Sequence, residues 1–317
     1  MKAMVRVLDA ADAPEDVLDR VYDVMARCHA EVSAEAPYRS RAETVAFLRH
    51  PPELETREYW IAESEGECIG FGQLAVGSSS PTARVDVQVH PDSRRLGHGT
   101  ALLEAVRRQA TARGARVLIG AHATEAGSRF ATTAGAVDAQ RNVDSVLRLP
   151  LALHAHPVSG YRLLSWNGAA PAELLGSFAR AREAINDSPA PSAEEVEVWD
   201  AARVRDLEAA LERRDREVRV TVALDEHDEV VAFTELRVSR TLGATATTED
   251  TAVVRGHRRK GLGRWVKLES LRRLQDDRPD VTQVTTVNAE ENEAMRGLNE
   301  ALGFSPVAVW TNCVLET

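Results

Sequence analysis

Two glycines and several cations gather where an apolar strand meets a helix in the second half of the chain. The stretch RRKGLG, Arg258 to Gly263, follows TAVVRGH and precedes RWVKLESLRRL. Glycine lets the backbone turn tightly and approach a ligand closely, because it has no Cβ. The helix that begins there offers unpaired N–H groups and a positive dipole end, which suit a phosphate or pyrophosphate. Tight packing beside a solvated basic patch would explain the same residues.

The sequence lacks two common phosphate-binding patterns. It contains no G-x-x-x-x-G-K-[ST], and no G-x-G-x-x-G that follows a first strand and precedes an acidic residue about 20 positions later. A nucleoside triphosphatase site and a classical dinucleotide site are therefore not expected.

The same succession of strand, glycine turn and helix occurs earlier, in ARVDVQVHPDSRRLGHGTALLEAVRRQ. The helix there carries Leu102, Leu103, Val106 and Ala110 on one face. Arg94, Gly97 and Gly99 correspond to Arg258, Gly261 and Gly263, an offset of 164 residues. Downstream, Gly135 and Gly303 are offset by 168. We therefore predict two copies of one unit, with a first glycine turn at Arg94 to Gly99 and a second at Arg258 to Gly263.

A chain of 317 residues fits two domains, each able to bury a sizeable core. Each half is expected to contain opening helices, a hairpin, strand–turn–helix, strand–helix and a final strand pair. This order predicts an α/β (α+β) fold with a mixed sheet and helices on its faces. Proline, glycine and serine in LRLPLALHAHPVSGYRLLSW indicate a boundary, so we predict domains of residues 1–155 and 156–317.

The composition of the chain indicates which kinds of partner and which cellular location to expect. A net charge of −10 argues against nucleic acid as the main partner. With no 18-residue apolar run and no apolar signal core, neither a membrane partner nor secretion is expected, which makes the cytoplasm the expected location. The cysteines Cys28, Cys68 and Cys313 are scattered, so buried or idle thiols are expected and a metal site is not.

The two turns carry a recognisable signature. The pattern V-x-P-x-x-[RQ]-x-x-G-x-[GA] of the GNAT acyltransferase superfamily is matched by Val89, Pro91, Arg94, Gly97 and Gly99. The second copy matches through Val253, Arg258, Gly261 and Gly263, with Arg255 in place of the proline. Downstream, NEAMRGLNEALGF resembles N-x-x-A-x-x-[LF]-Y-x-x-x-G-F through Asn292, Leu298, Gly303 and Phe304. The chain thus resembles a tandem GNAT acetyltransferase, in which each copy has a mostly antiparallel sheet with one splayed parallel pair and flanking helices.

The resemblance implies acetyl-CoA as co-substrate and no metal. Backbone N–H groups of the glycine turn would bind its pyrophosphate, and the preceding strand would pair with the pantetheine arm. The implied residues are Val87, Val89, Arg94, Arg95, Leu96, Gly97, His98, Gly99 and Thr100 in the first copy, and Thr251, Val253, Arg258, Arg259, Lys260, Gly261, Leu262, Gly263, Arg264, Asn288 and Asn292 in the second. The rings of His98 and His257 are expected to be solvated or beside phosphate. For Asn288, helix capping with Glu291 is the alternative.

Acetyl transfer needs a neutral amine, and reaching that form at pH 7 costs about 4.6 kcal/mol for a pKa of about 10.4. In several family members a glutamate on the strand before the turn assists as a base. Counting back nine residues from Arg258 reaches Glu249, whereas the same count from Arg94 reaches Val85. Strand alternation places Glu249 with Thr251 and opposite Asp250. Glu249 is therefore the candidate base, with a solvated residue at the strand's start as the alternative.

The usual general acid of the family is a tyrosine, and it is replaced in both copies. Its position falls at Asn299 in the second copy and at Ala131 in the first. Asparagine can donate a hydrogen bond but cannot supply a proton. A thiol with a pKa of about 8.5 can leave as thiolate, so activity is compatible with this change. Asn299 is the candidate at this position, with an inter-helix contact as the alternative, and His122 could face the thioester gap of the first copy.

The expected function is an acetyl-CoA-dependent N-acetyltransferase that acts on a small amine, with the second copy catalytic. The first copy would be a second CoA site or a structural partner. A CoA-binding module without turnover and a protein or peptide N-acetyltransferase are the alternatives. The sequence leaves the acceptor, the number of CoA sites and the oligomeric state open.

Overall fold

A computed structural model of the chain describes residues 4–32, 38–51, 55–77, 81–152, 156–189, 196, 198–240 and 244–317. The chain divides into two compact units. The first unit contains the described residues of 4–142 and 308–317, and the second contains those of 143–189 and 196–307. Each unit therefore includes residues from both halves of the sequence. The predicted domain boundary at 155/156 falls at the edge of 153–155, outside the described residues, and stays a prediction.

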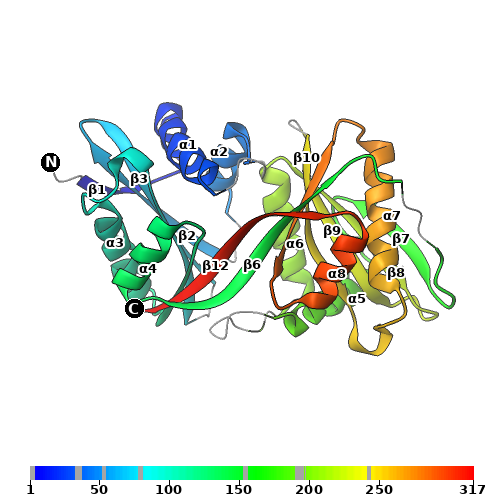
Figure 1. The fold of residues 1–317 in the computed structure, drawn as a ribbon. Coiled ribbons are helices and arrows are strands. Elements are labelled where there is room, and N and C mark those ends of the chain that lie inside the picture. Colours follow the sequence, from blue (N-terminus) through cyan, green and yellow to red (C-terminus); the bar gives the residue numbers. More distant parts are fainter. Residues whose placement is uncertain are drawn as a thin grey trace. The chain divides into compact units, whose positions relative to one another are not determined.

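The first unit is a sheet in the order β1-β2-β3-β4-β5-β12 with helices around it. Its elements are β1 (Met4–Leu8), α1 (Glu15–Ala30), α2 (Arg41–Arg49), β2 (Glu55–Ser64), β3 (Glu67–Gly77), β4 (Thr82–Val89), the 3-10 helix η1 (Pro91–Ser93), α3 (His98–Ala112), β5 (Val117–His122), α4 (Glu125–Ala134) and the start of β6 (Val137–Arg148). The end of β12 (Ser305–Glu316) pairs antiparallel with β5, so the C-terminus lies beside α4 (Figure 1).

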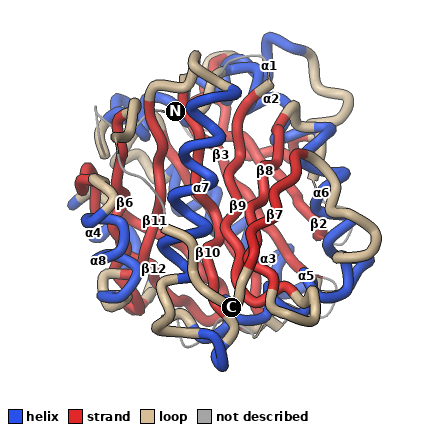
Figure 2. Tube along the Cα trace, turned by 90° about the vertical axis from the view of Figure 1, so that its right-hand side faces the viewer, coloured by secondary structure: helices blue, strands red, loops and turns tan. Residues whose placement is uncertain are grey.

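The second unit repeats this plan in the order β6-β11-β10-β9-β8-β7. Its elements are the end of β6, then β7 (Arg162–Asn167), α5 (Leu175–Arg182), the 3-10 helix η2 (Glu183–Asp187), α6 (Ala201–Arg213), β8 (Arg216–Leu224), β9 (Val230–Ser239), β10 (Thr245–Val253), η3 (Arg255–His257), α7 (Leu262–Asp277), β11 (Gln283–Ala289) and α8 (Glu293–Ala301). Helix α7 runs along β8 and β9 (Figure 2).

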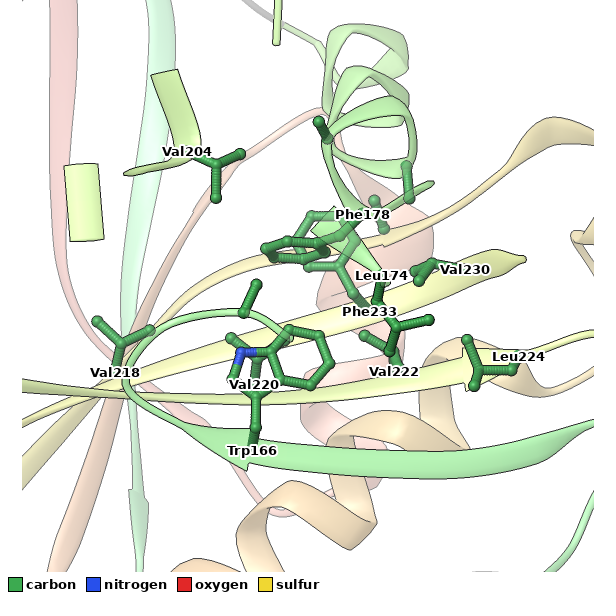
Figure 3. Packing of buried hydrophobic residues seen from close by; sticks show 14 of the residues in the cluster. Trp166, Leu174, Phe178, Val204, Val218, Val220, Val222, Leu224, Val230 and Phe233 are labelled. Carbon is green, nitrogen blue, oxygen red and sulfur yellow. The ribbon is translucent and has the colours of Figure 1, made fainter. Parts of the chain in front are cut away.

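The core of the second unit lies on both faces of its central strands. On one face, Val218, Val220, Val222 and Leu224 of β8 pack with α5 and α6 around three aromatic rings, those of Trp166, Phe178 and Phe233 (Figure 3). Phe178 meets each of the other two rings edge-on at 5.4 Å. On the other face, Ala223 packs with residues of α7. Because both faces are covered, β8 and β9 are almost wholly buried.

Each sheet contains one parallel pair that separates part-way along. In the first unit, β4 and β5 pair from Thr82 to Arg84. In the second, β10 and β11 pair from Thr245 to Thr248. The predicted fold, a mixed sheet with a splayed parallel pair and flanking helices in each copy, is confirmed. In the described part of the chain, no helix has the length and apolar character needed to cross a membrane.

Candidate active site

The two glycine turns have the same backbone conformation. Gly97 and Gly261 precede the first residues of α3 and α7 with φ values of 84° and 85°. Arg95 and Arg259, two residues earlier, also have positive φ values of 67° and 63°. A Cβ on Gly97 would meet nothing within 4 Å, so the backbone conformation, not lack of space, favours glycine there. This geometry leaves the first N–H groups of each helix without intrahelical partners, as a bound anion would need.

The second glycine of the first turn allows close packing, whereas a Cβ on the second glycine of the other turn would make an ordinary van der Waals contact. A Cβ on Gly99 would lie 3.3 Å from Cε2 of Phe130, and one on Gly263 would lie 3.5 Å from Cγ2 of Val253. The helix can therefore start close to its neighbours, which keeps its N-terminus at the end of the preceding strand.

The signature arginines are held by bonds within their own units. Nε of Arg258 donates to the Val253 carbonyl at 2.9 Å, and Nη2 donates to Asp187 at 2.5 Å. Arg94 repeats this pattern, with Nε 3.1 Å from the Val89 carbonyl and Nη2 2.5 Å from Glu31. Both guanidinium groups thus fasten the turn to the strand and to a preceding helix.

The remaining charge around the turns differs between the copies. Arg259, Lys260 and Arg264 are exposed at the second turn, where Lys260 Nζ also donates to the Tyr161 hydroxyl at 2.7 Å. That hydroxyl lies 3.0 Å from Nδ1 of His257. The first turn presents Arg95, exposed Leu96 and Thr100.

The expectation for the His98 ring is wrong. The side chain is only 4% exposed, because the first residue of the helix points into the core. Leu262, its counterpart, is also buried, which leaves only the backbone at this position to meet a ligand.

A cavity of about 180 Å³ lies in the second unit where β10 and β11 separate. It is lined by Ile185, Ser188, Pro189, Glu249, Asp250, Thr251, Lys267, Thr286, Val287, Asn288, Ala289, Asn292 and Met295. Four residues predicted from the sequence line this cavity: Glu249, Thr251, Asn288 and Asn292. A fifth, Asn299, does not line it but is hydrogen-bonded to Asn288.

Both carboxylates of β10 reach this cavity, contrary to simple alternation. The pairing of β10 with β9 shifts register between Thr248 and Thr251, and Glu249, Asp250 and Thr251 all line the wall. Such an irregularity re-aims the side chains of the bulged strand. The prediction that Asp250 lies opposite Glu249 is therefore wrong.

Asp250 has a raised pKa. Burial raises its pKa to about 6, against the lowering effect of the Arg182 charge. Its Oδ2 accepts a hydrogen bond of 2.8 Å from Nη2 of Arg182. Oε2 of Glu249, which is more open to solvent, lies 3.6 Å from Nη1 of Arg237.

A network of ion pairs holds the carboxylates of Asp250 and Glu249 in place. Arg182 Nη1 and Arg237 Nη2 contact the two oxygens of Glu235 at 2.6 and 2.7 Å. Burial acts to raise the pKa of Glu235, but the charges of Arg237 and Arg182 hold it at about 2. The network therefore stays ionised and positions Asp250 through Arg182.

Lys267 of α7 lines the cavity but was not predicted from the sequence. Its side chain is 1% exposed, and Nζ donates to Oδ1 of Asn299 at 2.6 Å. Nδ2 of Asn299 in turn donates to Oδ1 of Asn288 at 2.6 Å. Burial lowers the pKa of Lys267 to about 7. The only signal in the sequence was a lysine within the otherwise apolar helix face of WVKLESL.

The cap of α8 is not the predicted one. Oδ1 of Asn292 accepts a bond of 3.2 Å from the Met295 N–H, so Asn292 is the N-cap. Asn288 lies inside β11 and bonds Asn299 instead. The capping interpretation of Asn288 is therefore wrong, and its side chain faces the site.

The corresponding region of the first unit contains a different set of polar groups. Val87 and Val89 lie on β4 beyond its last pairing with β5, as Thr251 and Val253 lie on β10. Asp86 accepts a bond of 2.7 Å from Gln88, and burial raises the pKa of Asp86. His122 Nε2 lies 2.8 Å from Asp138. Among the described residues of either unit, no group of three or more His, Cys, Asp or Glu side chains could hold a metal ion.

Comparison with known proteins gives consistent matches. The profile of the acetyltransferase (GNAT) family matches residues 18–131 and 182–304. A mycothiol acetyltransferase of Nocardiopsis dassonvillei is 33% identical over 104 residues, which span 32% of this chain and 31% of that protein. The match thus covers about a third of that relative's length.

Two solved structures match nearly the whole chain. A tandem GNAT protein from the clavulanic acid biosynthesis pathway superposes with a TM-score of 0.84 and 27% identity, over 99% of this chain and 98% of that one. A GCN5-related N-acetyltransferase from Sphaerobacter thermophilus gives a TM-score of 0.73 at 14% identity, over 99% and 95%.

Proposed function

The chain belongs to the acetyltransferase (GNAT) family, with one match in each half, and we propose that it is an acetyl-CoA-dependent N-acetyltransferase acting on a small amine. The second unit is proposed as the catalytic one. The observation that carries this proposal is the cavity at the separation of β10 and β11, which combines two carboxylates with a buried lysine. The cytoplasm, expected from the sequence, is the proposed location.

The second unit has the features that acetyl-CoA would need. Backbone N–H groups of the second glycine turn, with Arg259, Lys260 and Arg264 around them, would hold the pyrophosphate. Pairing of β10 with β11 ends at Thr248, so the backbone of Thr251 and the N–H of Val253 are not paired with β11 and would be available to the pantetheine arm, whereas the Val253 carbonyl accepts from Arg258. The side chains of Asn288 and Asn292 would lie along it. When bound there, acetyl-CoA supplies an acetyl thioester.

The carboxylates of β10 would take the proton of the acceptor amine. A general base works best when its pKa lies near the operating pH. Asp250, with a pKa of about 6, fits this requirement and is oriented by Arg182. Glu249 remains the candidate predicted from the sequence, since it lines the same wall.

Three positions support the choice of the second unit. Lys267 lies six residues after Gly261, and Leu103 lies six after Gly97. Asn299 lies four residues before Gly303, and Ala131 lies four before Gly135. By register in the parallel pairs, Asn288 corresponds to Ala121. The first unit is apolar at all three positions while it keeps the glycine turn, which favours a CoA-binding or structural role there.

The names of two relatives direct the choice of acceptor. One is a mycothiol acetyltransferase and another belongs to the clavulanic acid biosynthesis pathway. Small molecules with an amine are therefore the first class to test, and peptides the second.

The test follows thiol release from acetyl-CoA with a library of small amines and with lysine peptides, while calorimetry measures CoA binding. We expect turnover with a small amine, a large loss in Asp250→Asn or Glu249→Gln, and loss of turnover in Gly261→Glu. CoA binding without thiol release for any acceptor would contradict the enzyme proposal. Turnover that survives Gly261→Glu but is lost in Gly97→Glu would place catalysis in the first unit.

A further inference from the structure

We propose that Lys267 is the general acid of the second unit and delivers a proton from Nζ to the sulfur of the leaving thiol. In this role it takes over from the tyrosine that the family signature has at the position of Asn299. The inference rests on the proposed function, because it assigns a further residue to the same reaction.

The geometry places the lysine, not the asparagine, on the cavity wall. Lys267 lines the cavity, and Asn299 lies behind it with its amide bonded on both sides. The amide nitrogen of Asn299 donates to Asn288, which leaves Oδ1 as the acceptor for Lys267 Nζ. One of the three protons of the ammonium is therefore used for orientation. The chain Lys267–Asn299–Asn288 holds Nζ where β10 and β11 separate.

The choice of residue type supports a proton-transfer role. The chain has 39 lysines and arginines, and only Lys2, Lys260 and Lys267 among them are lysines. Arginine cannot lose its proton in a protein, whereas lysine can when it is buried. The buried arginine of this site, Arg182, is paired with two carboxylates. The hydrogen-bond partner of Lys267 is instead a neutral amide, which does not lock the proton in place.

The acidity of the group matches the leaving thiol. Burial lowers the pKa of Lys267 to about 7. Transfer of its proton to a thiolate whose conjugate acid has a pKa of about 8.5 is favourable by roughly thirty-fold, whereas an ordinary lysine of pKa about 10.4 would oppose it by roughly a hundred-fold. The charged groups on the cavity wall besides Lys267 are Glu249 and Asp250 of β10. Helix α8 contributes Asn299, β11 contributes Asn288, and the Phe304 ring centroid lies 5.0 Å from Nζ.

The step balances in bonds and protons. The lone pair of the neutral amine forms the C–N bond to the acetyl carbon as the C–S bond breaks, and sulfur keeps the bonding pair. Lys267 Nζ gives sulfur a proton, and the carboxylate pair takes the proton that the amine nitrogen loses. Solvent then reprotonates Lys267 and deprotonates the carboxylate. The products are the acetylated amine and the free thiol, with no net change in protons.

The experiment compares Lys267→Met and Lys267→Arg with the wild-type chain of 317 residues. It measures kcat with acetyl-CoA from pH 5.5 to 9 and CoA affinity by calorimetry. We expect kcat to fall at least about a hundred-fold in Lys267→Met, as for loss of a general acid. The decrease of kcat that the wild type shows as the pH rises through about 7 should be absent in this variant. Its affinity for CoA should stay within a few-fold of the wild-type value. Lys267→Arg, which keeps the charge but holds its proton, should not restore kcat. Lys260→Met serves as the matched control and should weaken CoA binding while keeping the pH profile.

The outcomes separate this inference from the proposed function. If the wild type releases thiol and Lys267→Met retains kcat within three-fold with an unchanged pH profile, the general acid lies elsewhere and the acetyltransferase proposal stands. If the wild type shows no turnover, the proposed function fails, and this assignment fails with it. Should the variants not fold, an ¹⁵N titration of the lysine Nζ groups in the wild type decides, because only three lysines give signals. A Lys267 that remains protonated above pH 9.5 would overturn the assignment.

Discussion

Lys267→Met should change how the stability of the protein depends on pH, whatever the reaction it catalyses. Burial lowers the pKa of Lys267 from 10.5 to about 7 in the folded chain. Between these values the unfolded chain binds a proton that the folded chain does not, so the free energy of unfolding rises with pH. The slope is about 1.4 kcal/mol per pH unit, which gives an upper bound of about 5 kcal/mol over the whole interval. Below about pH 7 the penalty of the buried charge is fully present.

Methionine has a similar length and no charge, so the variant lacks this dependence. It leaves Oδ1 of Asn299 without its donor, which costs about 1–3 kcal/mol. At pH 6.5 we expect Lys267→Met to equal or exceed the wild type in stability by up to about 4 kcal/mol, which is the upper bound of the charge penalty minus the smallest value of this cost. By pH 9 the wild type should have gained about 2–3 kcal/mol on the variant.

The assay is chemical denaturation of both proteins at pH 6.5, 7.5, 8.5 and 9, reported as the difference between them. Other groups with shifted pKa values, such as Cys68 at about 11, contribute equally to both proteins and cancel in the difference. A difference that stays constant over this pH range would refute the reasoning, because it would mean that the lysine keeps an ordinary pKa in the folded state.

Three further predictions concern the turn, the ion network and the base. Gly261→Asn should keep CoA binding, since asparagine tolerates the φ of 85°, whereas Gly261→Val should strain the turn by about 1–2 kcal/mol and weaken binding in calorimetry. Arg182→Met should destabilise the second unit by about 3–5 kcal/mol in denaturation, because it strips Glu235 of a buried partner. Arg180→Met, which removes only the exposed pair with Glu229, should change stability by less than about 1 kcal/mol. In the wild type, the rate should fall as the pH drops through about 6, because Asp250 is then protonated. The rate of Asp250→Asn should not show this dependence on pH. If the variant still showed it, another group would be the base.

The turns and the repeat could be predicted because their signals are local. A positive φ at Gly97 and Gly261 favours glycine whatever the rest of the chain does, and the spacing of strand, turn and helix is visible in the sequence. The distribution of the last strands could not be predicted. Residues 308–317 join the first unit and residues from 143 onward join the second. Strand pairing of this kind depends on partners far apart in the chain, such as Cys313 of β12 and Gly120 of β5.

The polar residues of the site were predicted less well for the same reason. Alternation assigned Asp250 to the wrong face because the irregularity that re-aims it arises from the pairing with β9. A lysine on a helix usually lies on the solvated face, so the apolar neighbours of Lys267 in WVKLESL were only a weak signal of its burial. Its burial follows from the packing of α7 against Asn299 and Phe304, two residues that lie more than thirty positions away.

The two glycine turns share the bonds that shape them and differ in the residues that would meet an anion. In both turns, the signature arginine donates hydrogen bonds to a strand carbonyl and to an acidic side chain at the end of a preceding helix. Its first role is therefore to stabilise the conformation of the turn. Polyanion affinity then depends on the backbone N–H groups and on neighbouring cations. Lys260 and Arg264 of the second turn correspond, at the offset of 164 residues, to Leu96 and Thr100 of the first. The first turn thus keeps the bonds that shape it, whereas the second also has cations that would favour a pyrophosphate, in the unit whose cavity is lined by Asp250 and Lys267.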